Sequence, residues 1–358
     1  MISRDRLRRS LLRWYRVKAR PLPWRGTKDA YAIWVSEVML QQTQIRTVIP
    51  YYQRFLRIFP DVETLARARF ETVARLWSGL GYYRRARHMH RAAQEMVERF
   101  KGRFPEQYQE ARTLSGVGHY TACAVLSIAY NQPLPVLDGN VARVVARLNA
   151  WRGNLYQSAF RRRVERHLRC LLAPRRPGDF NQALMELGQT LCLPRAPRCF
   201  ACPLRKACKA FEENSPQLYP KPRARRPTER RHLATAIILR GKKAALIRGL
   251  DEGLLSDLWN FPAAFGTSRK QAVTNLETKL AGYGGSGARV RESAGSLRHN
   301  ITFRSIQVTL HPADLPGARG AFRWFSLDDL ERAPVSRLTR KIAHVLSQAP
   351  REHYEALK

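Results

Sequence analysis

The sequence predicts a mostly α-helical domain over residues 1–211 and an α+β domain over residues 232–348. Apolar residues recur at helical spacing through the first region, whereas short apolar runs bounded by turn residues follow in the second. Between them, residues 212–231 mix prolines with lysines and arginines, a composition typical of a stiff linker. Residues 349–358 are expected to form a tail. A chain of 358 residues has the length of about two domains.

Five stretches carry the helical prediction for the first domain. Leu7, Leu11, Leu12 and Tyr15 have the spacing of one apolar face on an amphipathic first helix. Strong apolar helical patterns follow over Tyr31–Ile45, Leu65–Trp77, Thr121–Tyr130 and Val141–Leu148. Asp138 precedes the last of these, where its carboxylate could cap the helix.

The second domain begins with a predicted hairpin. Ala234–Leu239 and Ala244–Arg248 flank the turn residues Gly241-Lys242-Lys243. Further strands are expected over Phe303–Leu310 and Phe322–Phe325, and a closing helix over Leu338–Leu346.

The charge of the chain restricts its partners. Lys and Arg number 64 against 28 Asp and Glu, so the formal net charge is +36. This balance favours a polyanion, nucleic acid above all. No apolar run approaches the roughly 18 residues needed to span a membrane. The basic N-terminus lacks the apolar core of a secretory signal, so we expect a cytoplasmic, nucleoid-associated monomer.

Four of the six cysteines form a cluster, Cys192, Cys199, Cys202 and Cys208, with the spacing C-x6-C-x2-C-x5-C. A reducing compartment argues against disulfides. Four thiolates so close in sequence can enclose zinc or an iron–sulfur cluster, and spacing alone does not separate the two. Cys123 and Cys170 lie among apolar residues and are expected to be small core residues.

Leu114-Ser115-Gly116-Val117-Gly118 predicts a tight turn. Its two glycines allow the backbone to turn and to expose its N–H groups, and a DNA phosphate could approach them closely.

Two carboxylates in contrasting settings are the candidate catalytic pair. Glu37 is the only charged residue between Asp29 and Arg46, and its apolar neighbours favour the protonated form. Asp138 lies in a basic region at a helix start and is expected to remain ionised. One such group can protonate a leaving group while the other stabilises an oxocarbenium-like sugar, as glycosidic-bond cleavage requires. A solvated Glu and a simple helix cap are the bland alternatives.

With these residues identified, the chain resembles the helix-hairpin-helix DNA glycosylases that carry a four-cysteine iron–sulfur cluster, and among them the MutY-type adenine DNA glycosylases. The stretches that carry the resemblance are Leu22-Pro23-Trp24-Arg25, 36–44, 79–83, Gly116-Val117-Gly118, 138–144, 180–188 and the cysteine cluster. They span nearly all of residues 20–210.

The resemblance implies a fold, a cofactor and site residues. It implies a helix-hairpin-helix glycosylase domain with a [4Fe–4S] loop over 192–208 and a Nudix (MutT)-like C-terminal domain. Its substrate would be double-stranded DNA with adenine opposite 8-oxoguanine or guanine, the adenine being flipped out of the stack. The implied catalytic residues are Glu37 as acid, Asp138 as cation stabiliser, and Tyr120 and Asn140 in support. The implied DNA-binding residues are Arg20, Leu22, Trp24, Arg25, Gln42, Leu80, Tyr82, Gly116, Gly118, His119 and Thr302. Arg84, Arg85 and Arg87 are also expected at the DNA face.

Departures from related patterns narrow the prediction. Relatives that also cut the strand have a lysine where this chain has Tyr120, and tyrosine cannot form a Schiff base. We therefore expect a monofunctional glycosylase, with an endonuclease III-like glycosylase/lyase as the alternative. The hairpin has Ser115 where the family usually has proline, and Phe303 stands where the family has a histidine.

Two other function classes explain the sequence less completely. A nucleotide pyrophosphatase would need paired glutamates on the helix over 268–277, which lacks them. A non-catalytic zinc protein that binds DNA would explain the charge and the cysteines but not Glu37.

Overall fold

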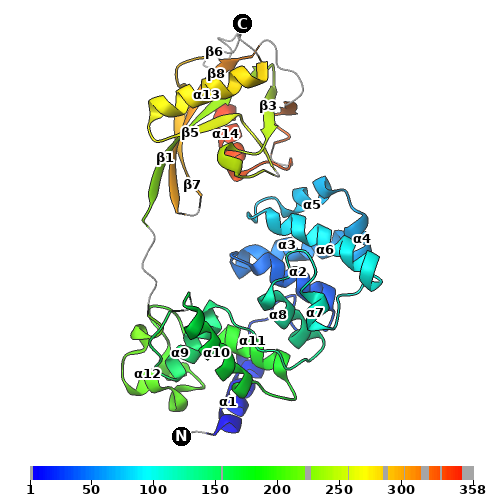
Figure 1. Ribbon diagram of the computed structural model, residues 1–358, viewed down its shortest axis with the longest axis vertical. Coiled ribbons are helices and arrows are strands. Elements are labelled where there is room, and N and C mark those ends of the chain that lie inside the picture. The colour runs from blue at the N-terminus through cyan, green and yellow to red at the C-terminus, as the bar shows by residue number, and fades with distance from the viewer. Residues whose placement is uncertain are drawn as a thin grey trace. The chain divides into compact units, whose positions relative to one another are not determined.

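The computed structural model describes residues 3–154, 156–221, 227–256, 258–284, 289–301, 303–315, 322–330 and 333–348. Two compact units divide the chain: residues 1–68 with 85–224, and residues 69–84 with 225–358. In Figure 1 the all-helical part of the chain runs from blue to green, and the part that contains strands runs from green to red. Among the described residues, no helix is both long and apolar enough to cross a membrane.

In the described residues of the α-helical region there are twelve helices, with short 3-10 turns in the cysteine loop. Their bounds are α1 Arg4–Lys18, α2 Ala30–Leu40, α3 Ile45–Ile58, α4 Val62–Arg67, α5 Phe70–Trp77, α6 Arg84–Phe100, α7 Tyr108–Ala111, α8 His119–Ala129, α9 Gly139–Leu148, α10 Ser158–Leu171, α11 Pro177–Thr190 and α12 Lys209–Glu212. The first helix and the α8 and α9 predictions are confirmed. The other two apolar stretches each contain a break, before α3 and before α5.

Helix α2 explains the first break. Asp29 caps its start, its carboxylate accepting the Tyr31 N–H at 2.9 Å. Every residue from Tyr31 to Met39 is buried, so α2 is a core helix without a polar face. The helix ends at Leu40, and Gln42 has a left-handed backbone with φ of 58°. The continuous apolar pattern concealed this turn, because Ile45 belongs to the next helix.

Arg85 holds the end of α2 from α6. Its Nη1 donates to the carbonyls of Val38 and Met39, at 2.9 Å each, and to that of Gln41 at 2.5 Å. Those carbonyls lack intrahelical partners at a helix end, so the guanidinium supplies them. Arg85 is half-buried and engaged by this helix end, whereas Arg84 and Arg87 are exposed. The placement of these three arginines at the DNA face stays a prediction.

A second group of helices packs around α9. The apolar faces of α1, α9, α10 and α11 form one core with the cysteine loop. Phe180 is fully buried in that core, as are Val141, Val145 and Val164. Helix α8 packs on α2 and α11, and so joins the two groups of helices. Cys123 is buried on α8 as expected, but Cys170 is exposed on α10 because it falls on the outer face of that helix.

The C-terminal region has two sheets flanked by helices (Figure 1). One sheet has the order β5-β1-β8-β6, with β7 also paired to β8, and β1 and β8 run parallel. The other has the order β2-β3-β4, with β9 paired to β3. The bounds are β1 Glu229–Ile237, β2 Leu239–Arg240, β3 Lys243–Arg248, β4 Trp259–Asn260, β5 Ala263–Gly266, β6 Arg289–Val290, β7 Gly295–Ile301, β8 Arg304–Asp314 and β9 Arg323–Ser326, with helices α13 Arg269–Gly284 and α14 Arg337–Gln348.

Alternating residues of β1 explain the two layers. Leu233 and Ile237 pack with Leu338 and Ile342 of α14, whereas Ala234 and Ala236 pack with Leu276 and other residues of α13. The α+β prediction is confirmed, including the hairpin at Gly241, whose φ is 56°. Phe303 lies in the turn between β7 and β8 rather than in a strand, and Thr302 lies outside the described residues.

Candidate active site

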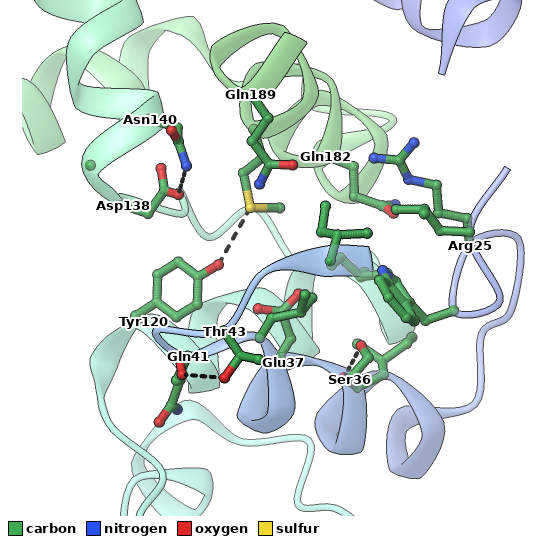
Figure 2. Close-up of a pocket in the computed structure, with 18 of the residues that line it drawn as sticks. Arg25, Ser36, Glu37, Gln41, Thr43, Tyr120, Asp138, Asn140, Gln182 and Gln189 are labelled. Carbon is green, nitrogen blue, oxygen red and sulfur yellow. Dashed lines mark hydrogen bonds between the residues drawn. The ribbon is translucent and has the colours of Figure 1, made fainter. Parts of the chain in front are cut away.

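A pocket of about 590 Å³ lies where α2, α8 and the start of α9 meet α11. Figure 2 shows Glu37, Tyr120 and Asp138 around this pocket. Apolar Ile33, Leu40 and Leu137 line it together with these polar groups. A concave site that combines apolar walls with convergent polar side chains is the usual form of a small-molecule or base-binding site.

Glu37 is the acid of this pocket. It projects from the core helix α2 and is only 6% exposed. Burial raises its pKa from 4.5 to about 7, Asp138 adds to the rise, and the Tyr120 hydroxyl opposes it. A carboxyl group with this pKa holds a proton at neutral pH and can still release it. The predicted protonated Glu37 thus has a physical basis in the burial of α2.

Both side-chain oxygens of Asp138 accept hydrogen bonds. Its Oδ1 accepts the Val141 N–H at 2.7 Å, which caps α9, and its Oδ2 accepts Asn140 Nδ2 at 2.8 Å (Figure 2). Asp138 can therefore cap α9 through Oδ1 while Oδ2, bound to Asn140, remains the oxygen for its expected role in the pocket. Asn140 fixes the direction in which the second oxygen faces the pocket.

Tyr120 closes one side of the pocket. Its hydroxyl donates to Met185 Sδ at 3.4 Å, and burial raises its pKa well above the usual value of 10. The phenol consequently stays neutral at any physiological pH. Position 120 therefore presents a neutral phenol to the pocket and not the amine of a lysine.

A chain of hydrogen bonds leads from Asp138 to the cysteine loop. Arg143 donates from Nη2 to Asn140 Oδ1 at 2.9 Å and to the Gly188 carbonyl at 2.7 Å. Its Nε donates to the Cys192 carbonyl at 2.8 Å. A Cβ on Gly188 would lie 2.7 Å from that of Asn140, so only glycine allows α11 to approach the first turn of α9 this closely. Sequence reasoning gave Arg143 no role.

Arginines at the pocket rim share one buried carboxylate. Glu186 on α11 accepts from Arg20 Nε at 2.6 Å and from Arg25 Nη2 at 2.5 Å. Burial opposes its ionisation, but these bonds outweigh burial and lower its pKa. Arg25 lines the pocket with Leu22 and Trp24, whereas Arg20 does not. Glu186 lies within residues 180–188, which carry the family resemblance, but the resemblance assigns it no role, and the structure reveals its part in fixing the two arginines.

The other predicted DNA contacts are spread over several turns. Gln42 lines the pocket, and Tyr82, with φ of 50°, is 47% exposed. Leu80 is buried in the same turn as Tyr82. His119 is partly buried, with Nδ1 2.6 Å from the Tyr108 hydroxyl. Gly116 has φ of 74°, as its turn requires, and Gly118 precedes the first residue of α8.

The four clustered cysteines border one small cavity beside α9. Arg147 is almost fully buried there and donates from Nη1 to Cys192 Sγ at 3.3 Å. In the part of the chain that the structure describes, no three His, Cys, Asp or Glu side chains are grouped so as to hold a single metal ion. Four thiolates around one cavity can hold either zinc or an iron–sulfur cluster.

The fold and the site together define a base-excision DNA repair protein. Residues 35–171 match the HhH-GPD superfamily of base excision DNA repair proteins. A solved thermostable thymine-DNA glycosylase is similar with a TM-score of 0.53 and 25% identity, over 59% of this chain and 97% of the other. An endonuclease III in a covalent DNA complex shares the fold, with a TM-score of 0.50 and 20% identity over 60% and 99% of the two chains.

Whole-chain comparison gives the family. The mouse adenine DNA glycosylase is 33% identical over 94% of this chain and 76% of its own length. The human enzyme is 33% identical over 94% and 73%, and that of Buchnera aphidicola from Acyrthosiphon pisum is 34% identical over 70% and 72%. The chain belongs to the adenine DNA glycosylase family.

Proposed function

We propose that this protein is a monofunctional glycosylase that hydrolyses the N-glycosidic bond of adenine opposite 8-oxoguanine or guanine in duplex DNA. Glu37 carries the proposal: a carboxyl group with a pKa of about 7, buried in a pocket of about 590 Å³ that Asp138 shares. In a repair role the protein acts on chromosomal DNA at the nucleoid.

The mechanism divides between two carboxyl groups. The protonated Glu37 donates its proton to the flipped adenine, at N7 by resemblance to the family, and so makes the base a better leaving group. The Asp138 carboxylate, aligned by Asn140, stabilises the positive charge that develops on the sugar. Glu37, now ionised, then accepts a proton from the attacking water. The bond that breaks is C1′–N9, and the bond that forms is from C1′ to water oxygen.

Tyr120 supports the monofunctional assignment. A lyase reaction would require an amine to form a Schiff base with the sugar. The neutral phenol contributes a surface for the base and sugar instead.

The cysteine loop is proposed to hold a [4Fe–4S] cluster through Cys192, Cys199, Cys202 and Cys208. Bound there, the cluster would cross-link four points of the loop and so stabilise it. Arg147 and Arg143 would transmit that rigidity to α9 through their bonds to Cys192.

Opposite-base recognition is assigned to the C-terminal, Nudix-like domain, with Thr302 as its candidate contact. Thr302→Ala is expected to reduce the preference for 8-oxoguanine over guanine. Thr274→Ala, an exposed threonine of α13, serves as the control.

The test of the function is a substrate panel. Duplexes with adenine opposite 8-oxoguanine, guanine or thymine, and a thymine-glycol duplex, are incubated with the protein. Abasic sites are then cut with hot alkali. We expect cleavage at adenine opposite 8-oxoguanine and guanine, and only after alkali. Cleavage of the thymine-glycol strand without alkali would instead support the endonuclease III-like alternative.

A further inference from the structure

The turn that presents Gly116 and Gly118 is tied to helix α6 by a single carboxylate. Ser115 N–H donates to Glu95 Oε2 at 2.7 Å, and Ser115 Oγ donates to Glu95 Oε1 at 2.7 Å. Both oxygens of Glu95 thus serve one residue of the turn. A proline at position 115 would have neither donor.

Two further contacts hold the same segment against α6. Arg99 Nη2 donates to Thr113 Oγ1 at 3.0 Å, one helical turn beyond Glu95. A Cβ at Gly116 would lie 2.6 Å from that of His88, so the turn approaches α6 as closely as glycine permits. The direction of the N–H groups after Ser115 is consequently set by α6 rather than by α8 alone.

Charge makes the position of Glu95 informative. Its side chain is 17% exposed and also accepts from Arg91 Nε at 3.1 Å. Burial opposes its ionisation, but the two Ser115 donors and Arg91 outweigh burial and lower the pKa of Glu95. An ionised carboxylate beside a turn that binds phosphate repels DNA. A favourable effect of Glu95 on DNA binding would therefore have to come through position.

We propose that Glu95 is a positioning residue of the DNA-binding turn, holding Ser115 so that the backbone N–H groups of residues 116–118 face a DNA phosphate. The proposal rests on the proposed function only in that the ligand is duplex DNA. Glu95 touches neither the base nor the sugar. Its loss should weaken DNA binding and leave the excision step of the bound complex unchanged.

The test compares two carboxylates of the same helix. Glu98 is exposed on α6, so Glu98→Ala removes the same charge without disturbing the turn. Dissociation constants are measured for an undamaged duplex at fixed salt with wild type, Glu95→Ala, Glu98→Ala, Ser115→Ala and the double variant of Glu95→Ala with Ser115→Ala. Adenine excision is followed in single turnover at saturating enzyme, and thermal melting monitors folding.

Electrostatics alone and the proposal predict opposite signs. Loss of a negative charge tightens DNA binding, and we expect Glu98→Ala to bind as tightly as wild type or more tightly. Glu95→Ala should bind about tenfold more weakly, because bonds to a charged group are lost. Ser115→Ala should show a smaller loss in the same direction. The double variant should bind no more weakly than Glu95→Ala, and all five proteins should share one saturating excision rate within about twofold.

Two results would overturn the proposal: Glu95→Ala binding as tightly as Glu98→Ala, or losses that add in the double variant. Should Glu95→Ala melt below the assay temperature, Ser115→Ala decides, and unchanged binding there overturns the proposal. Binding to undamaged duplex is independent of base excision. A wild-type protein that binds DNA but leaves adenine intact would therefore refute the proposed function and leave this test valid.

Discussion

Arg143 donates to Asn140 Oδ1 at 2.9 Å, and Asn140 in turn donates to Asp138, the proposed cation stabiliser, at 2.8 Å. The same guanidinium reaches the Cys192 carbonyl. The loop that holds the cation-stabilising carboxylate and the cysteine loop are therefore fixed by one side chain. A substitution that displaces the cysteine loop should therefore also shift Asp138, and the reverse should hold.

Replacement of Arg143 by Met tests this connection. Met retains the apolar stem and loses every donor, which leaves Asn140 and two carbonyls without their partner. We expect single-turnover excision to fall about tenfold or more and iron content to decrease, while binding to duplex DNA persists. Arg166→Met on the exposed face of α10 is the control. Wild-type excision in Arg143→Met would show that Asp138 needs no such support.

Removal of one cluster ligand should uncouple the cysteine loop. In Cys199→Ser a proposed iron ligand is lost, so we expect lower iron content, weaker visible absorbance and a lower melting temperature. Cys170→Ser provides the comparison, because Cys170 is exposed and lies outside the cluster. A colourless wild-type protein containing one zinc ion would contradict the cluster assignment.

Borohydride treatment probes Tyr120. A Schiff base is reduced to a stable enzyme–DNA adduct, and a phenol forms none. We expect no trapped complex from the wild-type protein on a cleavable adenine duplex. Efficient trapping that disappears on replacement of one lysine would place the nucleophile elsewhere and the chain in the bifunctional class.

The raised pKa of Glu37 also predicts a pH-dependent stability. Its folded pKa of about 7 exceeds its usual 4.5, so its protonated form contributes stability that is complete below pH 4.5 and is lost as pH rises through 7. Glu37→Gln removes this dependence. Relative to wild type, the variant should gain up to about 3 kcal/mol of unfolding free energy between acid and pH 8. Chemical denaturation across this range measures it, with Glu98→Gln expected to show no such gain.

Much of this site follows from residue type and spacing alone. The isolation of Glu37 among apolar residues predicts its burial and its raised pKa. The position of Asp138 before an apolar helical face predicts the cap. Both depend on neighbours in sequence, and local patterns report such neighbours well.

Contacts between distant segments could not be predicted in this way. Arg85 and Arg87 are alike in sequence, and the contacts of Arg85 with the carbonyls of Val38 and Met39 follow from the fold alone. Glu186 and Glu95 lie on ordinary helical faces, and their partners are 166 and 20 residues away. The break after Leu40 was hidden because α2 is apolar on all sides.

Adenine release is proposed to depend on a proton that Glu37 supplies. Single-turnover excision of adenine opposite 8-oxoguanine, measured against pH with wild type and Glu37→Gln, tests it most directly. In wild type the rate should fall about tenfold per pH unit above 7, as Glu37 loses its proton. Glu37→Gln should bind the duplex with wild-type affinity and leave adenine intact at every pH. A Glu37→Gln protein that excises adenine at near the wild-type rate would contradict the claim.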